Sequence, residues 1–199
     1  MNLGRSVSGP GRAILAAVLL CSGCGGNWVN LSKNAAFDEG SDDAVVVLKA
    51  NPLATFTILP GWTDRNGWAV VATLGDKYQI NPVDGYIVLK LAPRSGQASY
   101  GIVRVRPAND SSPMFAKGYS VVRGRELPTF HAIRGQVTYV GALSFEESGD
   151  DLRLSIEPDT GSDDVRMVAQ YMARTYPKVR AKVAVDALRM VARTDGPSD

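Results

Sequence analysis

The sequence predicts a mainly β protein: an antiparallel, β-sandwich-like domain with one C-terminal amphipathic helix. Short β-branched or alternating segments recur along the chain, and turn sequences such as Asn66-Gly67 separate them. Turns spaced roughly 8–12 residues apart are typical of sandwiches and open barrels. Only one helical pattern stands out, late in the chain, and no βαβ rhythm is present, so a parallel sheet is not expected.

The chain opens with the pattern of an export signal. Arg5 and Arg12 precede an apolar run of eight residues, Ala13–Leu20. A basic start, a short apolar segment and small residues after it are typical of a secretory signal. A membrane-spanning helix needs about 20 apolar residues, so the run is too short for one. We therefore expect residues 1–23 to be a signal peptide.

The end of this signal carries the first resemblance to a known family. Leu20-Cys21-Ser22-Gly23-Cys24 resembles the lipobox of bacterial lipoproteins, although Cys21 stands where leucine is usual. The resemblance implies cleavage between Gly23 and Cys24, acylation of Cys24, and attachment to the lipid bilayer through that residue. It implies a place in the cell envelope, and Gly25 in place of aspartate implies the outer membrane, facing the periplasm.

Two other interpretations of this segment stay open. Ordinary signal cleavage near Gly23 or Gly25 would release a soluble, secreted binding protein. Cys21 and Cys24 also have the spacing of a C-x-x-C redox or metal pair, but the later residues contain no cysteine to complete a zinc site.

Charge argues against nucleic acid as a partner. The chain has 22 basic and 20 acidic residues, and the expected signal peptide contains two of the basic residues and no acidic ones. The mature chain would therefore have a net charge of zero, without the long-range positive field that nucleic-acid binding needs.

Residues 24–43 are expected to form a flexible tether. They are rich in glycine, asparagine, serine and acids, with few large apolar side chains, among them Leu31 and Phe37. A coil of about 19 residues would reach roughly 25 Å and let the domain stand away from the headgroups.

The expected globular domain covers residues 44–193, followed by a disordered tail at 194–199. Each predicted strand combines β-branched or alternating apolar residues with a turn signal at its end. The predicted strands are residues 44–50, 54–59, 67–73, 77–80, 85–91, 99–106, 118–123, 128–133, 136–145 and 151–157.

A helix is predicted over residues 162–176. Apolar side chains recur there at helical spacing, Asp163 and Asp164 suit its N-terminus, Arg174 suits its C-terminus, and Pro177 ends it. A last strand is expected between residues 179 and 185, and residues 186–191 are compatible with further helix. Three short motifs carry a wider resemblance: Pro82-Val83-Asp84-Gly85-Tyr86, Val137-Thr138-Tyr139-Val140-Gly141 and Tyr176-Pro177. Through them the chain from about residue 44 to residue 191 is similar to small bacterial lipoproteins with a β-sandwich and a late helix ending in Tyr-Pro.

One segment suggests ligand binding. Trp62 and Trp68 flank a polar loop that contains Asp64 and Arg65. Exposed indoles offer a large contact surface for a sugar or peptide at low entropic cost. The competing interpretation is that Trp68 fills the core while Trp62 covers an edge.

No catalytic or metal-binding constellation is found, and no cofactor is expected. His131 is the only histidine, and no serine lies in a G-x-S-x-G sequence. Asp159-Thr160-Gly161 spells the aspartic-protease triplet but directly precedes the predicted helix, so a turn and cap are expected there.

The sequence therefore predicts a membrane-anchored envelope lipoprotein that acts in binding or assembly, with an envelope protein or glycan as partner, and not an enzyme. The alternative is a periplasmic hydrolase that uses two carboxylates, drawn from Asp64, Asp84, Glu146, Glu147 and Asp150.

Overall fold

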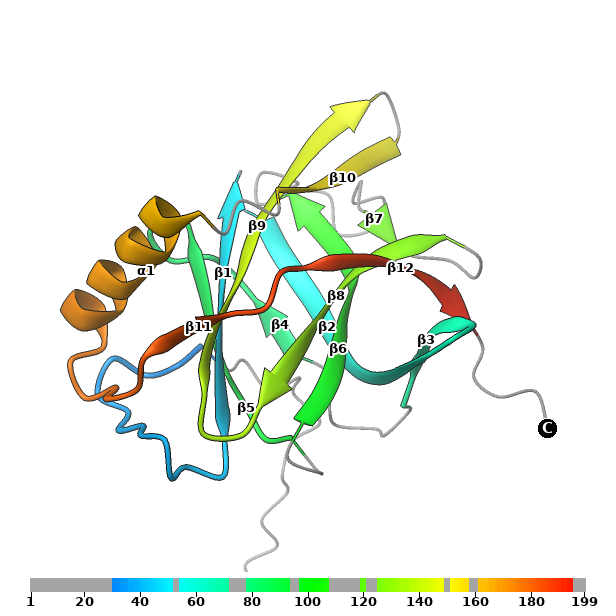
Figure 1. Cartoon of the computed structure of the whole chain (residues 1–199). Coiled ribbons are helices and arrows are strands. Elements are labelled where there is room, and N and C mark those ends of the chain that lie inside the picture. The colour runs from blue at the N-terminus through cyan, green and yellow to red at the C-terminus, as the bar shows by residue number, and fades with distance from the viewer. Residues whose placement is uncertain are drawn as a thin grey trace, which may run out of the picture.

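A computed structural model of the chain describes residues 30–51, 54–71, 78–93, 97–107, 119–120, 125–148, 151–157 and 161–194. At positions 51, 64, 78, 79, 97, 107, 119, 120, 147, 148 and 151–153 it describes the backbone only. The described residues form twelve strands and one helix, which confirms a mainly β domain with a C-terminal helix (Figure 1). The elements are β1 (Ala44–Asn51), β2 (Ala54–Asp64), β3 (Gly67–Val70), β4 (Tyr78–Ile80), β5 (Tyr86–Leu91), β6 (Gln97–Pro107), β7 (Tyr119–Ser120), β8 (Glu126–Ile133), β9 (Val137–Ser148), β10 (Asp151–Glu157), α1 (Ser162–Thr175), β11 (Val183–Val185) and β12 (Arg189–Thr194).

The strands form two sheets. The first has the order β10-β9-β1-β5, and β11 pairs with β9 as well. The second has the order β4-β2-β3-β12-β8-β6-β7, and an additional pairing joins β2 to β6. The pairs β2–β3, β3–β12, β12–β8, β8–β6 and β6–β2 therefore close a ring, so part of the second sheet is a small five-stranded barrel.

The expectation of a purely antiparallel arrangement is wrong for three strand pairs. β1 pairs with β9, β11 with β9, and β12 with β3, all in parallel. β1 lies in the middle of the first sheet, and its residues from Ala44 to Leu48 are all at most 1% exposed. A continuous apolar strand buried on both faces is typical of a parallel pairing.

The β1–β9 pairing contains a bulge at Gly141. Val47 pairs with Tyr139 but Lys49 pairs with Ala142, so β9 has one extra residue there. Gly141 takes a φ of 99°, which glycine adopts without the steric cost that a Cβ would bring. Tyr139 before the bulge faces the helix, whereas Leu143 after it faces the second sheet.

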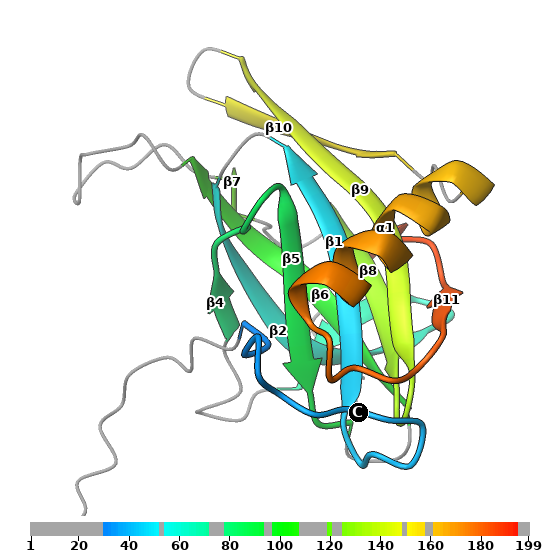
Figure 2. The same ribbon diagram turned by 90° about the vertical axis from the view of Figure 1, so that its left-hand side faces the viewer.

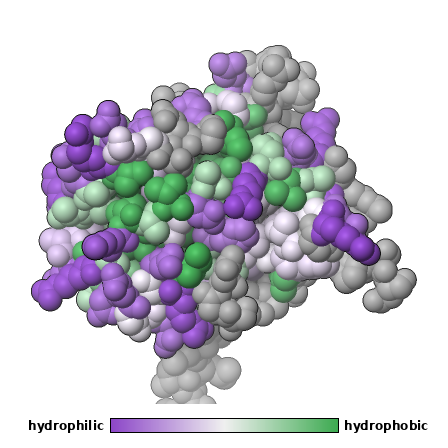
Figure 3. All heavy atoms as spheres, viewed as in Figure 1, coloured by the Kyte–Doolittle hydropathy of each residue, from purple (hydrophilic) through white to green (hydrophobic). Residues whose placement is uncertain are grey.

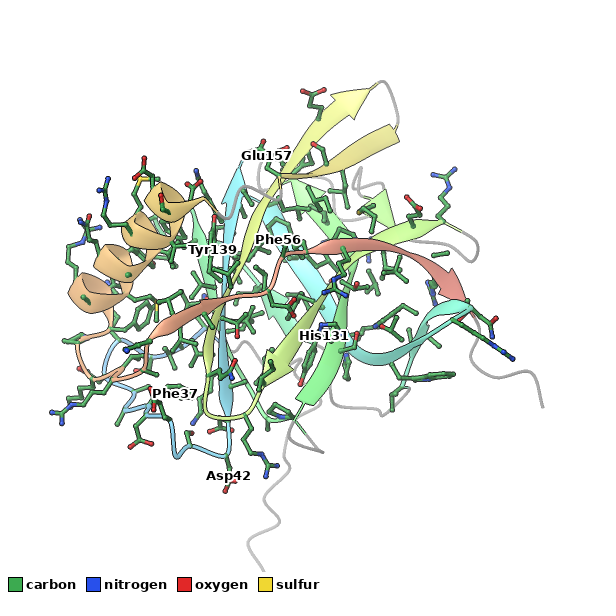
Figure 4. All side chains as sticks on the ribbon, viewed as in Figure 1. Phe37, Asp42, Phe56, His131, Tyr139 and Glu157 are labelled. Atoms are coloured by element: carbon green, nitrogen blue, oxygen red, sulfur yellow. The ribbon has the colours of Figure 1, made fainter. Side chains whose placement is uncertain are left out.

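Three apolar cores stabilise these layers. The largest lies between the two sheets and includes Leu48, Phe56, Ile87, Ile102 and Phe130, of which Phe56 is labelled in Figure 4. A second lies between the outer face of the first sheet and α1, which crosses β5, β1 and β9 in Figure 2. A third fills the inside of the barrel.

The barrel interior is built around Trp68, which is 0% exposed and packs with Leu127. Two glycines make room for its indole. A Cβ at Gly61 would lie 2.3 Å from Trp68 Cε2, and a Cβ at Gly101 would lie 2.8 Å from Trp68 Cζ2. A tryptophan fits inside so small a barrel because the facing wall carries no side chains at these two positions.

The expected tether needs a correction in its described part, residues 30–43. This segment, which we call the strap, lies against the domain. Leu31 and Phe37 are 4% and 3% exposed and belong to the core beneath α1. Leu31 N–H donates to Val88 O at 2.9 Å, and Phe37 N–H donates to Lys178 O at 3.2 Å. Two well-spaced apolar side chains are enough to hold an otherwise polar segment in place. The average composition of the segment does not reveal this.

The end of the chain also differs from expectation. Residues 186–188 are not helical, and residues 189–194 form strand β12. Asp186 and Leu188 first donate backbone hydrogen bonds to Tyr139 O and Val140 O, and the chain then crosses to pair with β8 and β3. The strand partners on both sides override the local helical pattern.

The helix α1 agrees with the prediction to within one residue. Asp163 and Asp164 lie in its first turn and Arg174 in its last. Asp164 lies 4.0 Å from Lys49 Nζ of β1, which connects the start of the helix to the sheet. Gly161 is the N-cap residue, whereas Asp159 and Thr160 of the protease-like triplet lie outside the described residues.

Candidate functional site

The two tryptophans do not form a joint binding surface. In the β2–β3 hairpin Trp62 pairs with Ala69, and Thr63 pairs with Trp68. Neighbouring strand residues point to opposite faces, so Trp62 and Trp68 lie on opposite sides of the hairpin. Trp68 is buried in the barrel, which confirms its interpretation as a core residue, and Trp62 is half-buried. Arg65 is exposed in the turn, and only the backbone of Asp64 is described.

One end of the barrel carries a group of polar side chains that we call the barrel-mouth cluster. Ser99 pairs with His131 and Gly101 pairs with Thr129 across β6 and β8. Because Gly101 faces Trp68, the other three residues also lie on the inner face of the barrel. The cluster comprises Thr63, Ser99, Thr129, His131, Asp186 and Arg189.

The centre of this cluster is a histidine–carboxylate pair. His131 Nδ1 lies 3.0 Å from Asp186 Oδ2, and their side chains are 27% and 23% exposed (Figure 4 labels His131). Arg189 Nη2 lies 3.5 Å from the other oxygen of Asp186. Thr129 Oγ1 donates to Arg189 O at 3.2 Å. These bonds join β8 to the chain that enters β12, and so they hold the barrel closed at this end.

The same pair is also arranged for acid–base chemistry, which the sequence did not reveal. A carboxylate on Nδ1 orients an imidazole and leaves Nε2 as a general base, and Ser99 lies directly across the strand pair. However, the Ser99 hydroxyl is 3.1 Å from Thr63 Oγ1, so its hydrogen bond is made to Thr63. Asp186, Ser99 and His131 come from three distant segments, and no local sequence pattern connects them.

A second feature is a polar groove between the strap, the β8–β9 turn and the chain before β11. It encloses a volume of about 340 Å³ and is lined by Glu39, Arg134, Gly135, Gln136, Ala181, Lys182 and Ala184. Arg134 also lies 3.3 Å from Asp42 and donates to Pro93 O at 3.0 Å. The groove therefore has charged walls of both signs and is situated where the strap joins the domain.

Buried tyrosines fix α1 to the first sheet. Tyr171 stacks on Tyr86 with ring centroids 4.3 Å apart, and its hydroxyl donates to Val83 O at 3.2 Å. Tyr176 meets Tyr171 edge to face at 6.1 Å. Burial raises the pKa of the Tyr171 and Tyr176 phenols above their ordinary value, since a phenolate there would lose its hydration.

The acids proposed for a hydrolase are only partly described. Asp84 lies in the turn before β5 and Glu146 is exposed on β9. The side chains of Asp64 and Glu147, and all of Asp150, lie outside the described residues, as do Gly23 and Cys24.

In the described part of the chain, no three His, Cys, Asp or Glu side chains come together as a metal site. Nor is any described helix long and apolar enough to cross a membrane.

In comparisons with protein-family models, curated proteins and solved structures, nothing matches this chain.

Proposed function

We propose that the chain is an envelope lipoprotein, anchored by acyl groups on Cys24, whose β domain acts as a binding or assembly module at the membrane surface. The lipobox-like sequence ending at Cys24 supports the anchor. On this proposal the domain faces the periplasm from the outer membrane, and an envelope protein or glycan is its partner.

Because the strap is packed against the domain, an anchor at Cys24 would hold the domain close to the membrane. If Cys24 is acylated, residues 24–29 alone separate the lipid from Asn30, where the described chain begins. Six residues span at most about 20 Å even when fully extended. Asn30 would therefore lie within about 20 Å of the headgroups, so the membrane would limit which partners can reach this end of the domain.

A serine substitution at Cys24 tests the anchor. Intact mass of the wild-type protein should show an N-terminus at Cys24 carrying acyl mass, and the protein should fractionate with membranes. The Cys24→Ser variant should lose the fatty-acid label and become soluble, whereas Cys21→Ser, the matched control, should keep both properties. A Cys24→Ser protein that stays with membranes would contradict the proposal, as would a wild-type protein without acyl mass.

A second candidate function, ester hydrolysis, is favoured by one observation: the His131–Asp186 pair lies across the strand pair from Ser99. In such a reaction Ser99 Oγ would attack the ester carbonyl, its proton would pass to His131 Nε2 and then to the leaving alcohol, and water would release the acyl group. Covalent labelling by a fluorophosphonate that is lost in Ser99→Ala and kept in Thr63→Ala would support it. Absence of labelling in the wild-type protein would rule it out.

A further inference from the structure

The chain between α1 and β11 presents a stripe of positive charge. Lys178, Arg180 and Lys182 are exposed, while Val179 and Ala181 between them turn inward onto the core beneath α1. In the described part of the chain, none of the three basic side chains takes part in an ion pair. We call these three residues the basic stripe.

The strap holds the basic stripe close to the N-terminal end of the domain. Phe37 forms a β-bridge with Val179, and Arg180 N–H donates to Phe37 O at 2.8 Å. Figures 1 and 2 both show the strap, in blue, beside the orange-red chain that follows α1. In Figure 3 the lower left of the molecule, where this chain lies, is strongly hydrophilic.

The acidic side chains of the strap neutralise little of the positive charge of the basic stripe. Asp42 lies 3.3 Å from Arg134, and Asp43 lies 2.7 Å from Lys90, so these two carboxylates already have partners. Apart from them, residues 30–43 and 176–182 contain four basic and two acidic side chains. This end of the domain is therefore positive, although the expected mature chain has no net charge.

We infer that the basic stripe rests on anionic phospholipid headgroups. This inference builds on the proposed lipid anchor, because only the six residues 24–29 would then separate the lipid from Asn30 and keep this end of the domain near the bilayer. Lysine and arginine are attracted to an anionic surface within about a Debye length, roughly 8–10 Å at moderate salt. An acyl anchor combined with a basic patch also fixes which way a domain faces, and here the barrel would point away from the membrane.

Vesicle binding of unacylated protein tests the stripe independently of the anchor. The processed chain with Cys24→Ser is sedimented with vesicles of zwitterionic phospholipid alone or with anionic phospholipid added. Each basic residue at the surface strengthens binding about five-fold, so Lys178→Gln, Arg180→Gln and Lys182→Gln together should weaken binding to anionic vesicles about 100-fold. Binding should also fall with added salt and be negligible without anionic lipid.

A matched control removes three exposed arginines elsewhere: Arg65→Gln, Arg125→Gln and Arg166→Gln. The β2–β3 turn and the start of β8, which carry the first two, lie across the molecule from the stripe in Figure 1. The control has the same net charge as the stripe variant and should bind nearly as well as the parent. Equal binding by the two variants would overturn the inference, and so would binding that does not depend on lipid charge.

Acylated wild-type protein in anionic vesicles supplies the second measurement. Amine-labelling footprints should show Lys178 and Lys182 protected and Lys49, on β1, labelled as in solution. Equal labelling of all three would overturn the basic-stripe inference even if acyl mass at Cys24 had established the anchor. If the proposed anchor were wrong, the vesicle binding of the unacylated protein would be unaffected. Failure of the anchor and failure of the basic-stripe inference therefore give different results.

Discussion

Adding one methyl group at Gly61 should strain the barrel, because the space for a side chain there is filled by Trp68. A Cβ at this position would lie 2.3 Å from Cε2 and from Cζ2 of the indole and 2.5 Å from Ala69 O. An ordinary contact begins at 3.4 Å, so the ring would have to move by about 1 Å. The ring is rigid and 0% exposed, and it also packs with Leu127.

Overpacking of this kind costs about 1–3 kcal/mol, and two simultaneous clashes place Gly61→Ala at the upper end, about 3 kcal/mol. Urea unfolding followed by tryptophan fluorescence and circular dichroism measures the free energy of unfolding. Trp68→Leu alone leaves a cavity and also destabilises the protein. Combined with Gly61→Ala it should cost at least about 1 kcal/mol less than the two changes summed, because the clash with the indole is then removed and only the close approach to Ala69 O remains.

Gly40→Ala is the matched control, since the nearest atom to its Cβ would be the Asp38 carboxylate at 3.4 Å on the surface. It should change the free energy of unfolding by less than about 0.5 kcal/mol. If Gly61→Ala were as stable as this control, or if its effect added fully to that of Trp68→Leu, the closed barrel around the indole would be refuted.

Three further predictions concern the strap, the helix and the barrel mouth. Phe37→Ala should lower the free energy of unfolding by about 3 kcal/mol, seen in urea melts, because it empties a site that is 3% exposed. Because burial raises the pKa of Tyr171, this phenol ionises first in the unfolded chain, above about pH 10, so its contribution to stability is constant below that pH and falls above it. Tyr171→Phe should reduce that alkaline slope in thermal melts recorded between pH 9 and 11, and an unchanged slope would contradict the assignment. Asp186→Ala should cost about 1–2 kcal/mol through the bond to His131, whereas Arg189→Ala, whose side chain is 67% exposed, should cost less than about 0.5 kcal/mol.

The sequence was sufficient to predict most strands and the helix because these depend on local patterns. The run from Ala44 to Leu48 and the helical spacing after Ser162 both correspond to observed elements. The same run also contained a sign of parallel pairing, because an unbroken apolar strand is buried on both faces. Its partner β9 lies about 90 residues further on, and no local pattern specifies such a pairing.

The barrel and its mouth could not be predicted for a related reason. No local sequence pattern marks Gly61 and Gly101 as the glycines that the indole approaches in space. His131 and Thr129 alternate on one face of β8, but the partner of His131, Asp186, lies 55 residues away in a segment compatible with helix. The strap was missed because two buried side chains, Leu31 and Phe37, are enough to hold a segment that is otherwise polar.

The barrel and the sheet-to-sheet core are one cooperative unit because they share strands. On β6 and β8, Tyr100 stacks on Phe130 at 5.7 Å within the large core, while the neighbouring Gly101 and Thr129 face the barrel. Unfolding the barrel would therefore expose the inner face of the sheet as well, so the two should melt in a single transition.

The strap stands outside this unit, since its buried apolar side chains, Leu31 and Phe37, belong to the core beneath α1. Its carboxylates Asp42 and Asp43 add ion pairs to Arg134 and Lys90. Its opening exposes few residues and leaves every strand pair of the two sheets in place, so it should need less free energy than opening either sheet. If Cys24 is acylated, opening of the strap lengthens the segment between the lipid and the packed domain from the six residues 24–29 to the twenty residues 24–43. The reach of the domain from the bilayer would then increase to about 70 Å when extended. If Cys24 carries the proposed anchor, the packing of Leu31 and Phe37 decides whether the domain stays at the membrane surface or extends away from it.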